Sequence, residues 1–157
     1  MEITKKQMGT IFVAFIFFGS SFAFAINWVL PSEQKQEKRL PNVFEQPLSD
    51  SQVNYFLDKD VSVLILFYST DNKDSVNQKN IAESIANNMK DRLAVEEINV
   101  REYQSFSAYY NVRYVPTIII KGEANLNEPI RFESLLTESE LKNNICSSYK
   151  EKPSACG

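Results

Sequence analysis

Two cysteines are the residues of this sequence with the clearest potential for chemistry. Cys146 and Cys156 could form a disulfide, because Pro153 between them helps the chain to fold back. In an oxidising compartment this bond would hold the C-terminal tail and would stabilise the fold by roughly 2–3 kcal/mol in the loop-entropy model. The alternatives are a mobile redox pair, two free thiols or an intermolecular bond. We expect the structural disulfide, since spacing of this length is not a redox motif.

The rest of the composition excludes several classes of site. Histidine is absent from the sequence, which removes His-based triads, His metal ligands and a histidine pH switch. The cysteines are far from any carboxylate cluster with metal-site spacing, so we expect no metal site and no cofactor. The net charge of −3 gives no sign of the basic surface that binds nucleic acid, so we expect no nucleic-acid partner.

A valine–proline–threonine sequence before an apolar run marks a second candidate site. Pro116 cannot continue a helix, and the Val115–Pro116 bond is of the type that adopts the cis form at low cost. Thr117 then opens a run of isoleucines. We therefore expect a sharp turn, with a cis-proline, that leads into a buried strand.

Tyrosines are dense just before this turn. They could pack a short helix, or they could form a surface for a partner, because tyrosine is favoured where one end of the ring is buried and the other is wet. The candidates for the partner surface are Tyr109, Tyr110 and Tyr114.

Hydrophobic periodicity predicts alternating helices and strands around these sites. Ser49 or Asp50 can cap the first helix, and Thr137 opens the last one with a capping-box sequence. Residues 61–68 form a continuous apolar run, as in a central strand covered on both faces. The predicted order is helix to 57, strand 61–68, helix 75–91, strand 93–100, helix 103–110, strand 117–121, strand 129–133 and a helix from 137, with a further edge strand at 42–44. Alternation followed by a hairpin predicts an α/β fold with a mixed sheet flanked by helices.

The element order, the tyrosine-rich helix end and the sequence Val112-Arg113-Tyr114-Val115-Pro116-Thr117 resemble the thioredoxin superfamily over about residues 49–149. The resemblance implies a thioredoxin-like fold whose first strand is shortened. It also implies a groove at Val115, Pro116 and Thr117, where the family pairs its backbone with an extended peptide.

The family's redox centre is a Cys-x-x-Cys sequence at the start of the helix after the first central strand, where the helix end lowers the pKa of a thiol. The resemblance places this motif on Asn72, Lys73, Asp74 and Ser75. None of these residues can exchange disulfides. We expect a solvated loop here in which Asp71, Asp74 or Ser75 caps the helix, and we expect no catalytic residue.

The N-terminal part of the chain is apolar and carries no charge from Gln7 to Ser32. Residues 9–30 are long enough to cross a bilayer core of about 30 Å, so one interpretation is an uncleaved transmembrane anchor. The other interpretation is a signal peptide that is cleaved at Ala25. The expected division of the chain is an anchor or signal peptide (1–30), a polar linker (31–48) and a thioredoxin-like domain (49–157).

These observations predict an exported domain. It would be held at a membrane in the periplasm, or in another oxidising exported compartment, or it would be soluble in the periplasm after cleavage. The expected function is non-catalytic: a protein-binding scaffold, chaperone or assembly subunit, for example of a secretion or conjugation machine, with membrane or envelope proteins as partners. The alternative is a thiol–disulfide oxidoreductase or isomerase that uses Cys146 and Cys156.

Overall fold

The computed structural model describes residues 42–157. The predicted anchor or signal peptide (1–30) lies outside these residues, as does most of the predicted linker. Between residues 42 and 157, no helix is both long enough and apolar enough to cross a membrane.

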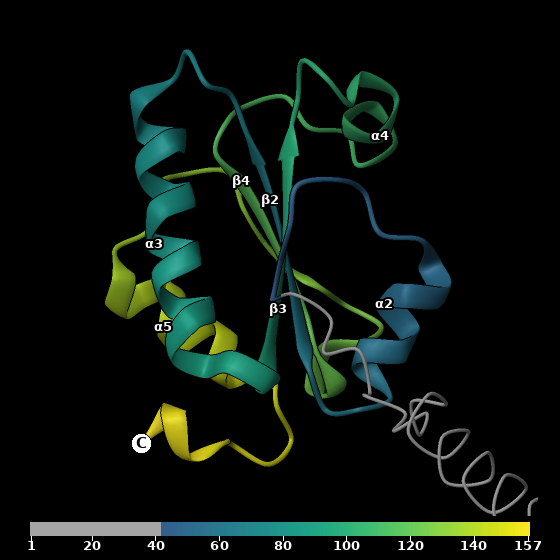
Figure 1. The fold of residues 1–157 in the computed structure, drawn as a ribbon, viewed down its shortest axis with the longest axis vertical. Helices are drawn as coiled ribbons and strands as arrows, with labels where there is room; N and C mark the ends of the chain where they lie inside the picture. The colour runs from purple at the N-terminus through teal and green to yellow at the C-terminus, as the bar shows by residue number, and fades with distance from the viewer. Residues whose placement is uncertain (1–41) are drawn as a thin grey trace, which may run out of the picture. The chain divides into compact units, whose positions relative to one another are not determined.

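A five-stranded mixed sheet forms the centre of this domain (Figure 1). In order across the sheet the strands are β1 (Val43–Phe44), β3 (Leu93–Asn99), β2 (Ser62–Tyr68), β4 (Thr117–Lys121) and β5 (Ile130–Phe132). Strands β1, β3 and β2 are parallel to one another, and β4 pairs antiparallel with both β2 and β5. The predicted α/β fold class is confirmed, and β2 occupies the central position that its apolar run predicted.

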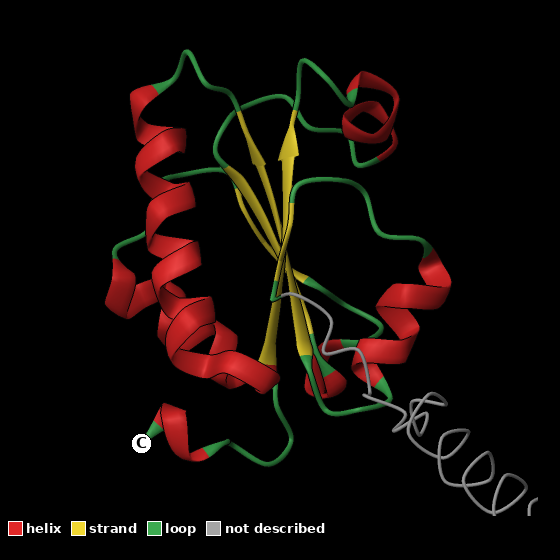
Figure 2. Cartoon of the chain, in the orientation of Figure 1, coloured by secondary structure: helices red, strands yellow, loops and turns green. Residues whose placement is uncertain are grey.

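Helices cover both faces of the sheet, as Figure 2 shows. One face packs against α3 (Lys73–Met89) and α5 (Glu138–Ser147), and the other against α2 (Asp50–Leu57) and α4 (Gln104–Tyr109). Successive side chains of β2 point to opposite faces, so Leu64 enters the first core and Ile65 the second. This double burial explains why β2 is apolar at almost every position.

The start of α3 differs from the prediction. The helix begins at Lys73 and its N-cap is Asn72, whereas the sequence analysis named Asp71, Asp74 or Ser75 as the cap. The Asn72 side chain accepts a hydrogen bond from the Ser75 N–H at 3.0 Å, which satisfies a backbone donor of the first turn. The prediction was wrong because several adjacent residues have side chains that can cap a helix. Which of them does so depends on where the backbone enters the helix.

The other helix ends follow the sequence more closely. Ser49 caps α2 and Thr137 caps α5, and both residues form the reciprocal bonds of a capping box. Helix α3 ends at Met89, because Lys90 has a φ of 42° in the left-handed region and begins the 3₁₀ turn η1 (Lys90–Arg92).

The sheet includes residues that precede Ser49, the predicted start of the domain. Val43 pairs with Val95 and Phe44 pairs with Glu96, which confirms the predicted edge strand. The side chain of Leu48 is only 7% exposed and packs in the core on the α2 side of the sheet. Residues 42–48 are therefore part of the folded domain.

The C-terminal tail is held against the body of the domain by a disulfide. Cys146, in the last turn of α5, is bonded to Cys156 in the 3₁₀ turn η3 (Ser154–Cys156), and their Cα atoms are 5.7 Å apart. The predicted pairing of these two cysteines is thus present in the structure.

The end of α5 approaches the sheet very closely. The Ser148 hydroxyl oxygen lies 2.7 Å from that of Ser62 at the start of β2. At the end of β4, a Cβ on Gly122 would lie 2.3 Å from the carbonyl oxygen of Ser148. Only glycine fits at position 122, because the Ser148 backbone occupies the space that a side chain needs.

Candidate functional site

The topology of the sheet brings two of the predicted sites to the same end of the domain. Strands β2 and β3 are parallel, so the loops that lead into α3 and α4 leave from one end of the sheet. Strand β4 is antiparallel to β2, so Pro116, just before β4, also lies at this end. The close contact of Ser148 with Ser62 and Gly122 places the Cys146–Cys156 disulfide at the opposite end.

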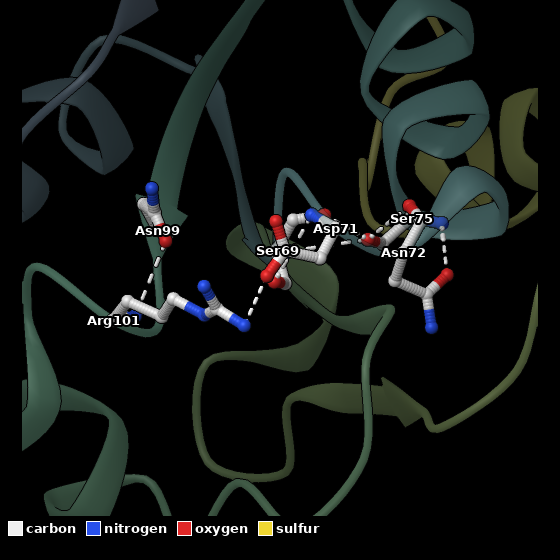
Figure 3. Close-up of polar contacts among 6 residues, drawn as sticks. All are labelled: Ser69, Asp71, Asn72, Ser75, Asn99 and Arg101. Carbon is white, nitrogen blue, oxygen red and sulfur yellow. Dashed lines mark hydrogen bonds and ion pairs between the residues drawn. The ribbon is translucent and has the colours of Figure 1, made fainter.

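The N-terminus of α3 is built by hydrogen bonds to backbone groups (Figure 3). Ser75 is fully buried, and its hydroxyl contacts the carbonyl oxygens of Ser69 and Asn72, both at 2.9 Å. The same oxygen accepts the N–H of Ser69 at 3.1 Å. The Ser75 hydroxyl therefore closes the turn before α3, and no side-chain base is among these contacts to activate it as a nucleophile.

The proline loop is joined to this helix end. The Val115–Pro116 bond is cis, as the sequence predicted. The Asn72 side-chain amide donates to the Val115 carbonyl oxygen at 3.4 Å, and the Thr117 hydroxyl donates to the Tyr114 carbonyl oxygen at 2.6 Å. The structure thus brings Asn72 and Val115 together and leaves Lys73 and Asp74 exposed on the first turn of α3.

A third group of contacts ties the loop after β3 to the loop after β2. The Arg101 side chain forms an ion pair with Asp71, and the backbone N–H of Arg101 donates to the Asn99 side-chain oxygen at 3.1 Å (Figure 3). The Asn99 amide donates to Glu102 at 2.8 Å. Both members of the ion pair are largely exposed, so we assign it a positional role worth no more than about 1 kcal/mol.

The three candidate tyrosines separate into two kinds. Tyr110 packs its ring against Phe67 and Phe106, with ring centroids 5.4 Å and 5.0 Å away, so it is a packing residue. Tyr109 is 82% exposed and Tyr114 is 66% exposed. Two large, rigid aromatic side chains therefore face solvent at the end of the domain that holds the proline loop.

The sequence analysis missed two buried carboxylates on β3. Glu96 points to the α2 side of the sheet and Glu97 to the α3 side, and neither side chain has appreciable exposure. Glu97 forms an ion pair with Lys79 of α3 at 2.7 Å, and Lys79 also pairs with Glu83. Burial opposes the charge on Lys79, but its hydrogen bonds to Glu83 and Glu97 outweigh this effect and raise the pKa of the ammonium group. Two adjacent acids inside a largely apolar strand were the signal that could have revealed the buried carboxylates.

The negative charge of Glu96 is less well compensated than that of Glu97. Burial raises its pKa to about 7, against a hydrogen bond from Leu48 and the charge of Lys121, which both lower it. Its Oε1 accepts the Leu48 N–H at 3.1 Å, and Oε2 has no hydrogen-bond partner among the described residues. Glu96 bonds to Leu48 and pairs with Phe44 of β1, so we place it outside the candidate site.

Comparison with known sequences gives two relatives. No protein-family model matches the chain. It is 30% identical over 105 residues to chloroplastic thioredoxin Y1 of Arabidopsis thaliana, which covers 66% of this chain and 59% of that protein. It is 42% identical over 45 residues to the thioredoxin of Methanocaldococcus jannaschii, covering 29% of this chain and 53% of that protein. The chain thus spans a little over half the length of the curated relatives that it matches.

Comparison with solved structures gives the same fold. A thioredoxin mutant from Halobacterium salinarum NRC-1 superposes with a TM-score of 0.55 at 24% identity, over 72% of this chain and 94% of that one. Chloroplastic thioredoxin z, described as defining a type-specific target recognition, superposes with a TM-score of 0.53 at 21% identity, over 65% of this chain and 89% of that one. At these identities the likeness shows the fold.

Proposed function

We propose that this domain, which has the thioredoxin-like fold, is a protein-binding module that works without a redox centre. Its binding surface is the end of the sheet that carries the proline loop and the N-terminus of α3. The exposed Tyr109 and Tyr114 and the partly exposed Val115 form this surface, whereas Pro116 and Thr117 are buried and contribute by fixing the turn of the loop. An extended segment of a partner protein would pair with the backbone of the loop and pack against the tyrosines.

The observation that carries this proposal is the exposure of Tyr109 and Tyr114. An exposed tyrosine offers a large contact area at a small cost in conformational entropy, which is why this residue type is enriched in protein interfaces. At the same end of the domain, the Asn72 side chain caps α3 and the Ser75 hydroxyl closes the turn before it. The chemistry available at this end is therefore recognition of a partner.

We place the domain in an exported compartment. Residues 9–30 would anchor it to a membrane, with the domain in the periplasm or in another oxidising compartment, or cleavage at Ala25 would release it there. The disulfide supports this location, since such bonds persist in oxidising compartments. Its partners would be membrane or envelope proteins, and its work that of a scaffold, chaperone or assembly subunit, as in a secretion or conjugation machine.

A second candidate function is thiol–disulfide exchange by Cys146 and Cys156, which the names of the relatives favour. Cys146 lies in the last turn of α5 and is only 6% exposed. Burial and the negative end of a helix dipole both disfavour a thiolate there, so the cysteine would be a poor nucleophile and a poor leaving group. We therefore rank exchange below protein binding.

Site-specific photo-crosslinking tests the binding surface. A photoreactive amino acid such as p-benzoylphenylalanine is placed at Tyr114 of the full chain in the cells that produce it, and at Leu126 as a matched control. Leu126 is also exposed but follows β4, at the opposite end of the domain. We expect discrete crosslinked products from position 114 only. Equal products from both positions, or none from position 114, would contradict the proposed surface.

An enzyme assay separates the two candidate functions. Reduction of insulin by dithiothreitol is followed with the wild-type chain and with the double variant Cys146→Ser, Cys156→Ser. We expect no acceleration by either protein, and crosslinking from position 114 that survives in the double variant. Acceleration by the wild type that the double variant loses would replace our proposal with the exchange function.

A further inference from the structure

Glu96 joins the first segment of the domain to the sheet. The carboxylate is completely buried on β3, and its Oε1 accepts the backbone N–H of Leu48, which lies 48 residues earlier in the chain. The second oxygen, Oε2, is also buried and has no hydrogen-bond partner in the part of the chain that the structure describes. A buried carboxylate with one neutral hydrogen bond is poorly compensated when it is ionised.

The segment that Glu96 holds, residues 42–48, is also attached by side-chain contacts at the edge of the sheet. Val43 and Phe44 each pack against a core, the Phe44 ring lies 5.7 Å from that of Phe56, and the Asn42 amide donates to the Ala86 carbonyl oxygen at 3.4 Å. Strand β1 contributes two residue pairs with β3, Val43 with Val95 and Phe44 with Glu96. The Val95 N–H donates to the Asn42 carbonyl oxygen at 2.7 Å, and the Leu48 side chain is buried in the α2-side core. Because β1 is short and lies at the edge of the sheet, the segment can open without unfolding the other strands.

The surroundings of Glu96 offer little charge to balance it. Lys121 of β4 is the charged side chain whose field acts on Glu96, but its Nζ lies 3.2 Å from the Tyr110 hydroxyl and over the Tyr110 ring. The charged and titratable side chains on the segment itself and on the elements packed over this face are Glu45, Asp50, Tyr55, Tyr103, Tyr109, Tyr110, Lys121 and Arg131. Glu45 and Asp50 carry the same charge as an ionised Glu96 and are exposed to solvent, so they do not compensate it.

We propose that Glu96 is a proton-controlled latch for residues 42–48. When the carboxyl is neutral, the segment stays docked on the sheet. When the carboxyl is ionised, opening of the segment admits water to the charge, and the docked state loses stability relative to the open one. The domain's attachment to the chain that precedes it would then respond to pH.

The direction of the pH effect follows from the pKa of Glu96. Burial raises this pKa from 4.5 to about 7, so between these values the docked state binds a proton that the open state has lost. The stabilisation is fully present below about pH 4.5 and is lost as the pH rises through about 7. Docking of residues 42–48 is therefore strongest in acidic solution and weakest in alkaline solution.

Hydrogen exchange of the full chain tests the latch. Protection factors, corrected for the intrinsic effect of pH, are measured at pH 5 and pH 8 for the amides of Leu48 and Val95, with α5 amides such as Leu141 as an internal reference. We expect protection of Leu48 and Val95 to fall by up to about 100-fold at pH 8 while α5 changes little. A loss of protection that is the same in α5 would indicate global unfolding and would overturn the latch.

Two variants make the test specific. Glu96→Gln cannot ionise and keeps an oxygen for the Leu48 N–H, so its protection should be the same at both pH values. Glu45→Gln, an exposed change in the same segment, should keep the wild-type response. A wild-type response in Glu96→Gln would overturn the proposal. If Glu96→Gln does not fold, NMR titration of the wild-type protein replaces it. The Leu48 amide shift and the Glu96 carboxyl shift should then change with the same midpoint pH, and different midpoints would overturn the proposal.

Discussion

The N-terminus of α3 and the C-terminus of α5 are the two helix ends at which this domain could have carried thiol chemistry. The first end favours a negative charge, yet it holds Asn72 and Ser75, whose side chains are engaged in hydrogen bonds with the backbone. The second end disfavours a negative charge, yet it holds the buried, oxidised Cys146. Cys146 is therefore placed at a helix end that disfavours a thiolate.

This difference shows that the position of a cysteine on a helix is more informative than its presence. Thiol exchange needs a thiolate that is accessible and stabilised, and a structural bond needs neither. The bond at the end of α5 restrains a tail, and the cap at the start of α3 shapes a surface. One end of the domain thus holds the C-terminal tail in place, and the other carries the surface that we propose for binding.

The largest expected effect is a difference in thiol reactivity between the two helix ends. One variant, Asn72→Cys, introduces a thiol at the N-terminus of α3, and the other, Cys156→Ser, frees the thiol of Cys146. At pH 7 we expect the introduced thiol to be alkylated by iodoacetamide about 100-fold faster, because the helix end stabilises its thiolate. Intact-mass kinetics between pH 5 and pH 10 give both rates, and a Cys146 that reacts as fast would refute the comparison.

A smaller effect concerns the packing that fixes the end of α5. Gly122→Ala should lower the free energy of unfolding by about 2–3 kcal/mol, because its Cβ would meet the Ser148 carbonyl oxygen at 2.3 Å and backbone cannot move aside easily. Gly157→Ala is the matched control, with 3.6 Å to the nearest atom, and should change stability by less than about 0.5 kcal/mol. Urea denaturation compares the two; equal stability would mean that α5 is loosely held.

The smallest effect tests the cap of α3. Asn72→Ala should lower the free energy of unfolding by about 1 kcal/mol, because the Ser75 N–H loses its acceptor. Asn72→Asp keeps an acceptor and adds a negative charge at the positive helix end, so its stability should be close to that of the wild type. Both variants lose the amide donor to Val115, so the difference between them in urea denaturation isolates the cap. If Asn72→Asp were as unstable as Asn72→Ala, the capping role of the Asn72 side chain would be contradicted.

The sequence predicted the parts of this structure that depend on local pattern. The apolar run of β2, the proline before Thr117 and the capping box at Thr137 each have a strong local cause, and all three were confirmed. The cysteine pairing was also predicted, because the two residues are near one another in the chain. Local preference and tertiary structure agree at these positions.

The parts that the sequence did not predict depend on partners that are distant in the chain. Asn72 became the cap in competition with three neighbours, and its amide also bonds to Val115, which is distant in the chain. The burial of Glu96 and Glu97 depends on Leu48 and Lys79, which come from other elements. Periodicity within a strand gives no information about such partners.

The disulfide at the end of α5 has a practical consequence for attaching the domain to other objects. Because Cys156 is bonded to the body of the domain, the position of Gly157 is restrained, and Figure 1 shows this end of the chain far from α4, the helix that ends at Tyr109. A fluorophore, an affinity tag or a sensor surface coupled to Gly157 would hold the domain by one end and leave the tyrosines facing solution. Gly157 is thus a suitable attachment point for binding measurements.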